Sequence, residues 1–582
     1  MDAINKTKIV ATLGPSSQTE QQILALVEAG MNVARINLSH GDRQGHAAFI
    51  ESVRNTRQKS GKHTAILLDT RGPEIRVGEL GSGIDLEPGQ IIRLGFSPQA
   101  PGTIPVNYHA LTEDVSVGTT LLLDDGKFRL RVSEIDGEEV VAEVTVGGHL
   151  SSRKRLSLPD IEVNLPSITD QDESDIIFGV QQEVDFIAVS FVRKKQDVHA
   201  VREVIERAGG NQSIIAKIEN RQGVDNLDEI IRAADGLMVA RGDLGVEMPA
   251  EEVPVIQKHI INASNRAGKP VITATQMLES MIHSASPTRA EASDVTNAIF
   301  DGTDAVMLSG ETAVGSYPLE AVRFLATCAQ ISEAALDYDS ILAEGLKHRK
   351  PIVTDAISYA SCATAADLSA TAIVTATTSG STALRVARYR PKTPIIAVSA
   401  HLSSLRKLQL IRGVIPLPCD PATTMDEQIN NVIGAAIGAG LLVSGDLVVI
   451  TAGMPLQTSG TTNMMKVRTI SFGKMQGAGL GNNQSSGIIR VVRDEKDWLN
   501  PPPHPVFVVP RILADMQPHL KQAAGIICEQ SLDEATSIDL ITSHSLPIIG
   551  RVVDGMKLLS NGQFVTLNSE SGLITYGESD PS

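Results

Sequence analysis

Eight short apolar runs recur along the first 310 residues, and segments with helical periodicity separate many of them. Near-continuous apolar strands that alternate with helices are typical of a parallel sheet whose outer face is covered. Eight such units predict an α/β fold built on a (β/α)8 TIM barrel. The expected strands are residues 8–14, 33–39, 65–70, 186–191, 214–219, 237–243, 271–276 and 305–310.

The repeating pattern is interrupted once and is followed by further regions. Between residues 71 and 164, helical periodicity gives way to Gly, Pro and short alternating runs, which indicates a small inserted β-barrel. An insertion after the third strand would place this domain over the active-site face as a lid. We expect the barrel in residues 1–70 and 165–342, the lid in 71–164, an open α/β domain in 343–472, and a linker with an extra C-terminal β/α domain in 473–582. The linker is expected at residues 473–486, which are rich in Gly, Asn and Gln.

Charge and composition argue against several classes of partner. The 68 acidic residues outnumber the 51 basic ones, and a net charge of −17 disfavours nucleic acid and anionic membranes. Aromatic residues make up 3% of the chain, too few for a base-stacking platform. We find no apolar stretch of about 18 residues, and we expect no targeting segment ahead of the first strand. The 4 cysteines lack metal-ligand spacing, so we expect reduced thiols in a cytoplasmic protein.

Polar side chains end most of the expected barrel strands, which is where such barrels carry their chemistry. Lys217 and Glu219 are two residues apart, so both side chains point to the same side of the strand. If that side faces inward, the two form a buried charge pair, which is costly unless it is functional or well paired. Ordinary turns would explain one or two polar strand ends, but they explain this pair poorly.

The residue types at these ends suit phosphoryl transfer. Glu219 and Asp243 offer hard oxygen ligands from adjacent strands, as Mg²⁺ prefers. Lys217 and Arg35 supply the positive charge that a phosphoryl group in transfer requires. A second group could hold a larger cation, although Asn and Ser are also common turn formers. Its members are Asn37, Ser39, Asp69 and Thr70.

Six stretches of the chain resemble, in order, the motifs of pyruvate kinases. They are residues 34–41 (ARINLSHG), 68–76 (LDTRGPEIR), 214–224 (IIAKIENRQGV), 238–245 (MVARGDLG), 274–291, and 308–313 (LSGETA). The resemblance covers about residues 1–470. It implies an enzyme of glycolysis that moves the phosphoryl group of phosphoenolpyruvate to ADP and forms pyruvate and ATP.

The resemblance also implies a role for each matching residue. Lys217 would stabilise charge on the phosphoryl group and the enolate, while Glu219 and Asp243 would hold Mg²⁺ or Mn²⁺. The K⁺ site would consist of Asn37, Ser39, Asp69 and Thr70, and Glu74 lies where potassium-dependent members carry a glutamate. The remaining implied residues are Arg35 and Arg76 around the phosphate and ADP, Asn37 and His40 toward the nucleotide, Gly242 with Asp243 at the substrate, Thr275 near the carbon that is protonated, and Ser309 on the proton route.

Two features concern the nucleotide and regulation. Gln171 occupies the position at which many family members carry a lysine, which leaves the nucleotide contacts open. Hydroxyls and a glycine before a helix-like segment form either a phosphate nest or an ordinary capped turn. The resemblance favours a phosphorylated effector here, a sugar phosphate or a nucleotide monophosphate, and it also implies a homotetramer. The loop consists of Thr377, Thr378, Ser379, Gly380, Ser381 and Thr382.

The last hundred residues resemble the extra domain of some bacterial pyruvate kinases, which is similar to the swivelling phosphohistidine domain of phosphoenolpyruvate-using synthases. The resemblance rests on residues 525–529 and 546–550. The position expected for the phosphohistidine holds Thr536. A Thr-Ser-His sequence occurs later and ends at His544, and we interpret it as coincidence. We therefore expect a structural or regulatory domain.

Two other functions fit parts of the pattern. A phosphoenolpyruvate or pyruvate aldolase on the same barrel would also use Glu, Asp and a nearby arginine with Mg²⁺. It would need neither the lid nor the potassium-type cluster. A catalytically inactive metabolite sensor would keep the effector loop but should have lost some charged strand ends, whereas Arg35, Lys217, Glu219, Asp243 and Thr275 are all present.

Overall fold

The computed structural model describes residues 5–96, 102–443, 445–453, 460–470, 472–531 and 546–577. The chain divides into two compact units, one formed by Ala3–Leu336 with Gln409–Arg412 and the other by Asp337–Leu408 with Gly413–Ser582. Among the described residues, none of the helices combines the length and hydrophobicity needed to cross a bilayer. Thr536 and His544, on which the expectation for the last domain depended, lie outside the described residues.

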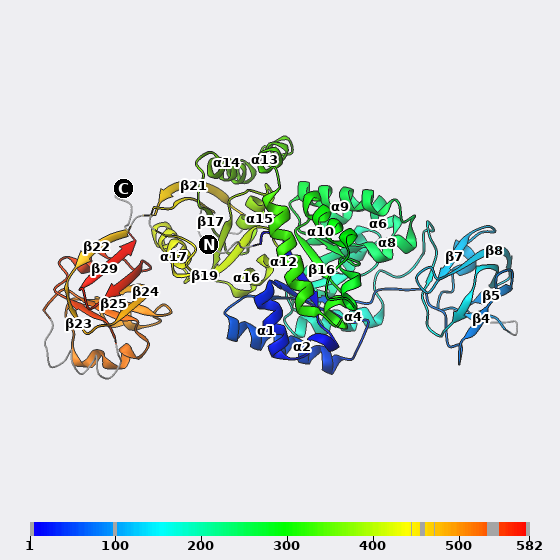
Figure 1. Ribbon diagram of the computed structural model, residues 1–582, viewed down its shortest axis with the longest axis horizontal. Helices are drawn as coiled ribbons and strands as arrows, with labels where there is room; N and C mark the ends of the chain where they lie inside the picture. The colour runs from blue at the N-terminus through cyan, green and yellow to red at the C-terminus, as the bar shows by residue number, and fades with distance from the viewer. Residues whose placement is uncertain are drawn as a thin grey trace. The chain divides into compact units, whose positions relative to one another are not determined.

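The first unit contains a closed barrel of eight parallel strands, which confirms the predicted (β/α)8 fold (Figure 1). The order around the barrel is β1-β16-β15-β14-β13-β12-β3-β2. The strands are β1 (Lys8–Thr12), β2 (Val33–Asn37), β3 (Ala65–Asp69), β12 (Phe186–Val189), β13 (Ser213–Ile218), β14 (Gly236–Ala240), β15 (Val271–Ala274) and β16 (Ala305–Leu308).

Eight helices surround the barrel strands, and each packs against the next around the ring. They are α2 (Arg43–Ser60), α1 (Glu20–Ala29), α12 (Pro318–Ala334), α10 (Arg289–Asp301), α9 (Val253–Ala267), α7 (Leu227–Ala233), α5 (Lys195–Arg207) and α4 (Asp170–Gln181). Arg54 of α2 closes the ring by donating to the carbonyl of Gln182 at the end of α4 (2.5 Å). Capping boxes begin α1, α4 and α10 at Thr19, Thr169 and Thr288.

The barrel strands are buried on both faces because side chains fill the interior and helices cover the exterior. Val10, Leu67, Ile215, Met238 and Ile272 belong to the inner cluster and are completely buried. A larger cluster lies between strands and helices. This double burial explains why the strands read as largely apolar runs, with most of their polar residues near the ends.

A mainly antiparallel β domain interrupts the barrel between β3 and β12. Its main sheet has the order β11-β7-β8-β9-β5-β6, and a smaller sheet pairs β10 with β4. A separate hydrophobic core fills this lid domain. Its elements are β4 (Ile84–Leu86), β5 (Ile91–Gly95), β6 (Ile104–Pro105), α3 (Leu111–Asp114), β7 (Thr120–Leu123), β8 (Phe128–Asp136), β9 (Glu139–Val146), β10 (Gly148–Leu150) and β11 (Leu156–Ser157).

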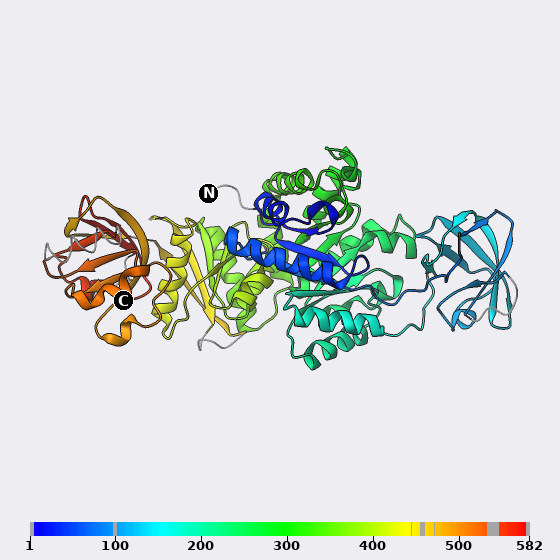
Figure 2. The ribbon, with the colours of Figure 1, turned by 90° about the horizontal axis from the view of Figure 1, so that it is seen from below.

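The second unit holds two sheets, coloured yellow and orange to red in Figure 2. The first has the order β19-β18-β17-β20-β21, with β21 antiparallel to four parallel strands, as expected for an open α/β domain. Its strands are β17 (Ala372–Ala376), β18 (Ile395–Ser399), β19 (Val414–Pro418), β20 (Leu447–Gly453) and β21 (Thr462–Thr469). Its helices are α13 (Tyr338–Lys347), α14 (Val353–Asp367), α15 (Ser381–Ala387), α16 (Leu402–Leu408) and α17 (Met425–Gly438).

The second sheet of this unit has eight strands in the order β22-β29-β28-β24-β25-β26-β27-β23. The tryptophan Trp498 stacks on His519, with ring centroids 4.8 Å apart, and lies 4.8 Å from the ring of Phe507. The elements are β22 (Phe472–Gln476), β23 (Ala478–Leu480), β24 (Gln484–Val491), β25 (Pro505–Val509), β26 (Gly525–Cys528), β27 (Ile548–Gly550), α19 (Gly555–Leu558), β28 (Phe564–Asn568) and β29 (Leu573–Gly577).

The expected linker at residues 473–486 is wrong, because these residues form β22, β23 and the start of β24. A methyl group on Gly473 would lie 2.4 Å from the ring of Tyr576, and one on Gly479 would lie 1.8 Å from the carbonyl of Ser569. These glycines therefore permit close approach between strands rather than flexibility.

The expected strand 237–243 is too long at its C-terminal end. β14 ends at Ala240, and Asp243 lies in the first turn of the short helix α8 (Arg241–Glu247). An acidic side chain is favourable in the first turn of a helix, which suits this local structure. Similar short helices, α6 (Arg221–Asp225) and α11 (Gly310–Ala313), follow β13 and β16.

Candidate active site

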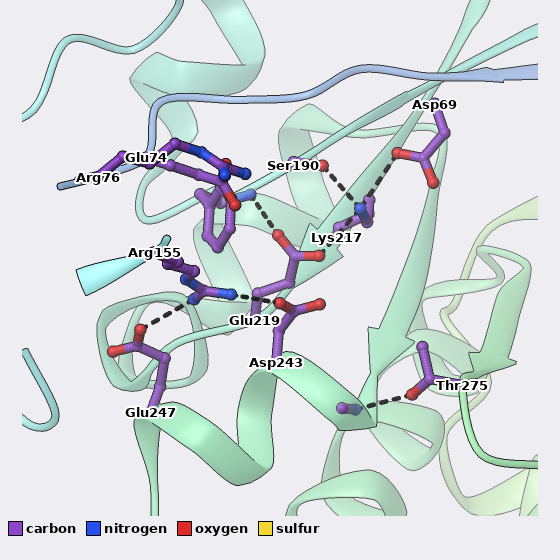
Figure 3. A network of polar contacts seen from close by, with 12 residues as sticks. Asp69, Glu74, Arg76, Arg155, Ser190, Lys217, Glu219, Asp243, Glu247 and Thr275 are labelled. Carbon is purple, nitrogen blue, oxygen red and sulfur yellow. Dashed lines mark hydrogen bonds and ion pairs between the residues drawn. The ribbon is translucent and has the colours of Figure 1, made fainter. Parts of the chain in front are cut away.

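Lys217 lies at the centre of a network at the carboxyl ends of three adjacent barrel strands (Figure 3). Its ammonium lies 2.6 Å from the hydroxyl of Ser190, 3.1 Å from Asp69 and 3.0 Å from Glu219. The Lys217 side chain is 11% exposed and both carboxylates are 1% exposed. The predicted pairing of Lys217 with Glu219 is therefore present, and Asp69 adds a second carboxylate.

These neighbours fix the charge of the buried groups. Burial lowers the pKa of Lys217, but the charges of Asp69 and Glu219 outweigh it, so the pKa of Lys217 is raised. Burial also raises the pKa of Asp69, but Lys217 and Arg35 outweigh that effect and lower it. Lys217 is thus held as a cation and Asp69 as an anion.

Arg35 brings a second positive charge to the same carboxylate. Its Nε lies 2.7 Å from Oδ2 of Asp69, and its Nη1 donates to the hydroxyl of Thr12 (2.8 Å). Arg35 belongs to β2, which lies between β1 and β3 in the barrel. It pairs in register with Leu67 of β3, the strand that carries Asp69. Two cations, Arg35 and Lys217, therefore lie on opposite oxygens of Asp69.

Glu219 is oriented by the end of the neighbouring strand. Its Oε2 accepts a hydrogen bond from the backbone N–H of Phe191 (2.6 Å), a residue with φ of 55°. Burial raises the pKa of Glu219 to about 7, with Lys217 acting against the rise and Asp243 adding to it. Glu219 and Asp243 therefore interact electrostatically.

Asp243 is bound by an arginine of the lid domain (Figure 3). Nη1 of Arg155 lies 2.5 Å from Oδ1 of Asp243, and its Nη2 lies 3.0 Å from Glu247. Asp243 and Glu247 both belong to α8, four residues apart on one face of the helix. Burial raises the pKa of Glu247 despite the charge of Arg155.

Thr275 is held in a backbone conformation that is rare for a β-branched residue, with φ of 67°. Its hydroxyl accepts from the N–H of Gly242 (2.7 Å), and its carbonyl accepts from Arg241 Nη2 (2.7 Å). Arg241 in turn pairs with Asp294 (2.7 Å). The hydroxyl of Thr275 is therefore fixed beside Gly242, the residue before Asp243.

The predicted larger-cation residues lie at the ends of β2 and β3. Asn37 and Asp69 are paired in register, which places their backbones side by side. The side-chain oxygen of Asn37 accepts from Ser39 N–H (3.1 Å), and the carbonyl of Thr70 accepts from the hydroxyl of Ser190 (2.8 Å). Carboxylate, amide, hydroxyl and carbonyl oxygens are the ligands of a hard cation.

Four other predicted residues make different contacts. The exposed His40 offers its carbonyl to the ring of His46 (2.7 Å), and Arg76 pairs with Glu74 in the lid domain. The backbone N–H of Ser309 donates to the carboxylate of Glu311 (2.7 Å). The buried hydroxyl of Ser309 has no hydrogen-bond partner within the described residues. Gln171, at the position where many members of the resembling family carry a lysine, donates to Asp175 (2.8 Å).

The predicted effector loop lies in the second unit, between β17 and α15. Gly380 has φ of 87° and donates its N–H to the Thr377 hydroxyl (2.9 Å). The Ser381 hydroxyl accepts from Gly460 N–H (3.3 Å), and the hydroxyls of Thr382 and Thr462 lie 3.1 Å apart. The loop thus contacts the beginning of β21, with several hydroxyls gathered at one place.

Several residues of the network, Ser190 and Arg155 among them, were not predicted from the sequence. Ser190 follows β12, so the position of polar residues after the apolar runs could have identified it. Arg155 stands in a basic run that the sequence alone does not distinguish from a solvated surface, and it reaches Asp243 across 88 residues of chain.

Comparisons with known proteins point to one family. The family model "Pyruvate kinase, barrel domain" matches residues 4–322, and "Pyruvate kinase, alpha/beta domain" matches residues 355–468. A pyruvate kinase of Geobacillus stearothermophilus is 46% identical over 579 residues, which cover 98% of this chain and 99% of that protein. One of Staphylococcus haemolyticus is 44% identical over 582 residues, covering 99% of each.

A solved structure of a Cryptosporidium parvum pyruvate kinase superposes with a TM-score of 0.76 at 38% identity. It covers 80% of this chain and 96% of that one. The bacterial relatives match nearly the full length, so they include the last sheet, which extends beyond the two family models. The chain belongs to the pyruvate kinase family.

Proposed function

We propose that this chain transfers the phosphoryl group of phosphoenolpyruvate to ADP, giving pyruvate and ATP, at the network around Lys217. Family membership over nearly the full length supports the reaction. The observation that carries the site assignment is a lysine held charged in a buried position between two carboxylates and a hydroxyl. A buried cluster of ionised side chains at the carboxyl end of barrel strands, where such barrels carry their chemistry, favours a functional role over a structural one.

In this proposal the phosphoryl group binds between the charges at the ends of β2 and β13. Lys217 and Arg35 stabilise the negative charge that develops on the phosphoryl oxygens, since transfer depends mainly on positioning and electrostatics. Asp69 keeps both cations in place and lowers their cost of burial. Gly242 and Asp243 lie next to the substrate, and Lys217 also stabilises the enolate that remains after transfer.

Glu219 and Asp243 are the proposed ligands of Mg²⁺ or Mn²⁺. Within the described residues, no group of three or more His, Cys, Asp or Glu side chains forms a complete metal site. Two carboxylates that follow neighbouring strands fit Mg²⁺, which keeps water and phosphate oxygens in its other positions. When bound, the ion neutralises charge on the phosphate oxygens.

The oxygens of Asn37, Ser39, Asp69 and Thr70 are the proposed K⁺ ligands, and they fit a large hard cation. The in-register pairing of Asn37 with Asp69 supports a shared site. Glu74 is consistent with K⁺ dependence through the family resemblance. Activity should therefore be much lower when Na⁺ replaces K⁺, and equal activity in both salts would contradict the assignment.

Thr275 and Ser309 are the proposed residues on the side where the enolate is protonated. Thr275 presents its hydroxyl from a fixed backbone, and the buried Ser309 hydroxyl is not engaged by another described residue. Asn37, His40 and Arg76 are the proposed nucleotide contacts. Gln171 supplies no charge to the nucleotide, so these three residues carry more of its binding.

We also propose activation by a phosphorylated metabolite at residues 377–382, where hydroxyls and backbone N–H groups gather. A homotetramer in the cytoplasm completes the proposal, in line with the family and with free thiols at all four cysteines. A panel of sugar phosphates and nucleotide monophosphates that left the phosphoenolpyruvate response unchanged would contradict the regulatory part.

The test of the reaction is ATP formation from phosphoenolpyruvate and ADP with Mg²⁺ and K⁺. Lys217→Met should reduce kcat by about a hundredfold or more, because it removes a preorganised charge at the transferred group. The matched control is Lys195→Met, which removes a lysine that is half exposed on α5. Wild-type chain without activity under these conditions would refute the proposed reaction, and an active Lys217→Met would refute the site.

A further inference from the structure

We propose that Arg155 of the lid domain competes with the divalent cation for Asp243, so that cation binding releases from the barrel the segment of the lid that carries Arg155. This inference rests on the proposed role of Asp243 as a metal ligand. It goes beyond that role by assigning a function to a residue of the lid that contacts neither Lys217 nor Arg35 in the described network.

The first observation is that Arg155 binds the proposed metal ligand directly. Its guanidinium spans α8, with Nη1 2.5 Å from Asp243 and Nη2 3.0 Å from Glu247 (Figure 3). This two-pronged geometry matches the fork of a guanidinium and gives strong, oriented hydrogen bonds. The positive end of Arg155 thus occupies one side of the carboxylate that would hold the metal.

The second observation is that the arginine is enclosed rather than lying on the surface. Its side chain is 9% exposed, and the guanidinium lies over the ring of Phe191, 4.7 Å from the ring centre. The backbone N–H of Phe191 is the group that binds Glu219. Arg155 is therefore packed against the support of one proposed metal ligand while it binds the other.

The third observation is that the backbone of Arg155 belongs to the lid. Its carbonyl accepts from Asp124 N–H (3.0 Å), and the next residue, Leu156, donates to the carbonyl of Ile75 (2.8 Å). An isolated bridge also pairs Arg155 with Arg76. The side chain is thus a link between the lid sheet and α8 of the barrel.

Like charges set the direction of the effect. A divalent ion on Asp243 would lie within a few ångströms of the guanidinium in a largely buried site, where repulsion between charges is poorly screened. Binding the cation must therefore weaken or break the bond between Arg155 and Asp243. Removing the positive charge of Arg155 should tighten cation binding, whereas a residue that merely orients Asp243 would have the opposite effect.

The experiment measures Mn²⁺ binding to the full chain without substrates, from the electron paramagnetic resonance signal of free Mn²⁺. Arg155→Gln should lower the Kd for Mn²⁺ by about tenfold, because it removes a competing charge but keeps a polar side chain. Arg153→Gln is the matched control: the same change two residues away, at an exposed arginine that pairs with Glu79. It should leave the Kd unchanged.

Further variants separate the possible failures. Arg155→Lys keeps the charge and should bind Mn²⁺ no more tightly than the wild type. Hydrogen exchange at the amide of Leu156 should accelerate when Mn²⁺ is added to the wild type, but should already be fast in Arg155→Gln. A Kd for Arg155→Gln equal to or weaker than that of Arg153→Gln overturns the proposal.

Asp243→Asn distinguishes this failure from that of the proposed function. If Asp243→Asn abolishes Mn²⁺ binding while Arg155→Gln leaves the Kd unchanged, the metal ligand stands and the competition is refuted. If Asp243→Asn binds Mn²⁺ as the wild type does, the assignment of the metal ligand fails, and the competition fails with it. Melting temperatures close to wild type show that each variant is folded.

Discussion

Ser190 positions Lys217 through two short hydrogen bonds. Its hydroxyl donates to the carbonyl of Thr70 (2.8 Å), which leaves an oxygen lone pair directed at the ammonium of Lys217 (2.6 Å). Ser190→Ala should lower kcat about tenfold, since a hydrogen bond to a charged group contributes roughly 1.5–3 kcal/mol. Steady-state kinetics, with melting temperature measured in parallel, test this. An unchanged kcat with a lower melting temperature would show a purely structural serine.

Lys8 carries a different kind of buried charge, at the first position of β1. It is 4% exposed, and burial lowers its pKa to about 8, only partly opposed by Glu333. Between pH 8 and the unfolded value of 10.5, the unfolded chain binds more protons, so this group makes stability rise with pH. Below pH 8 both states are protonated and the cost of burial is fully present.

Lys8→Met should therefore stabilise the first unit near neutral pH, by an amount on the order of 3 kcal/mol. The gain should shrink as the pH is raised toward 10.5. Thermal melting of both proteins across this range provides the measurement. A gain that grows with pH would mean that the lysine is stabilised, rather than penalised, by its surroundings.

At the level of elements, the glycines of β22 and β23 are the clearest prediction. Gly479→Ala would force a methyl group against the Ser569 carbonyl, so the last sheet should lose several kcal/mol or fail to form. Gln484→Ala, at an exposed position on β24, is the control within the same segment. Circular dichroism melting compares the two variants. Equal melting temperatures would restore the interpretation of this segment as a linker.

The elements also show what a sequence can predict. The eight apolar runs predicted the barrel because burial on both faces makes most residues of each strand apolar. Val10 and Ile215, for example, are buried inside the barrel. The pairing of Lys217 with Glu219 followed from the two-residue period of a strand. The contact of Arg155 with Asp243 could not follow from any local period, because it depends on how an inserted domain returns to the barrel.

The glycine-rich composition led to the wrong prediction of a linker for a related reason. A glycine that permits close approach, such as Gly479, has the same local signature as a glycine that permits motion. The difference lies in a partner about ninety residues further along the chain. The position of Asp243 in a helix was not predicted, because the sequence pattern shows no break between β14 and the first turn of the short helix α8.

At the scale of the whole molecule, the linked residues of the candidate site all belong to the first unit. A chain that ends at residue 470 lacks the last sheet but keeps the parts matched by the two family models. We expect it to retain kcat within about threefold, a difference below 1 kcal/mol in the barrier. A loss of activity in a folded, truncated chain would mean that the last sheet takes part in catalysis.

Trp498, the single tryptophan of the sequence, stacks on His519 beside the last sheet. The intrinsic tryptophan fluorescence of the chain therefore comes from one known place and reports on the surroundings of that sheet alone. No other residue of the chain contributes tryptophan fluorescence. Comparing emission with enzymatic turnover during heating would reveal, without any added dye, whether the barrel and the last sheet melt together or one after the other.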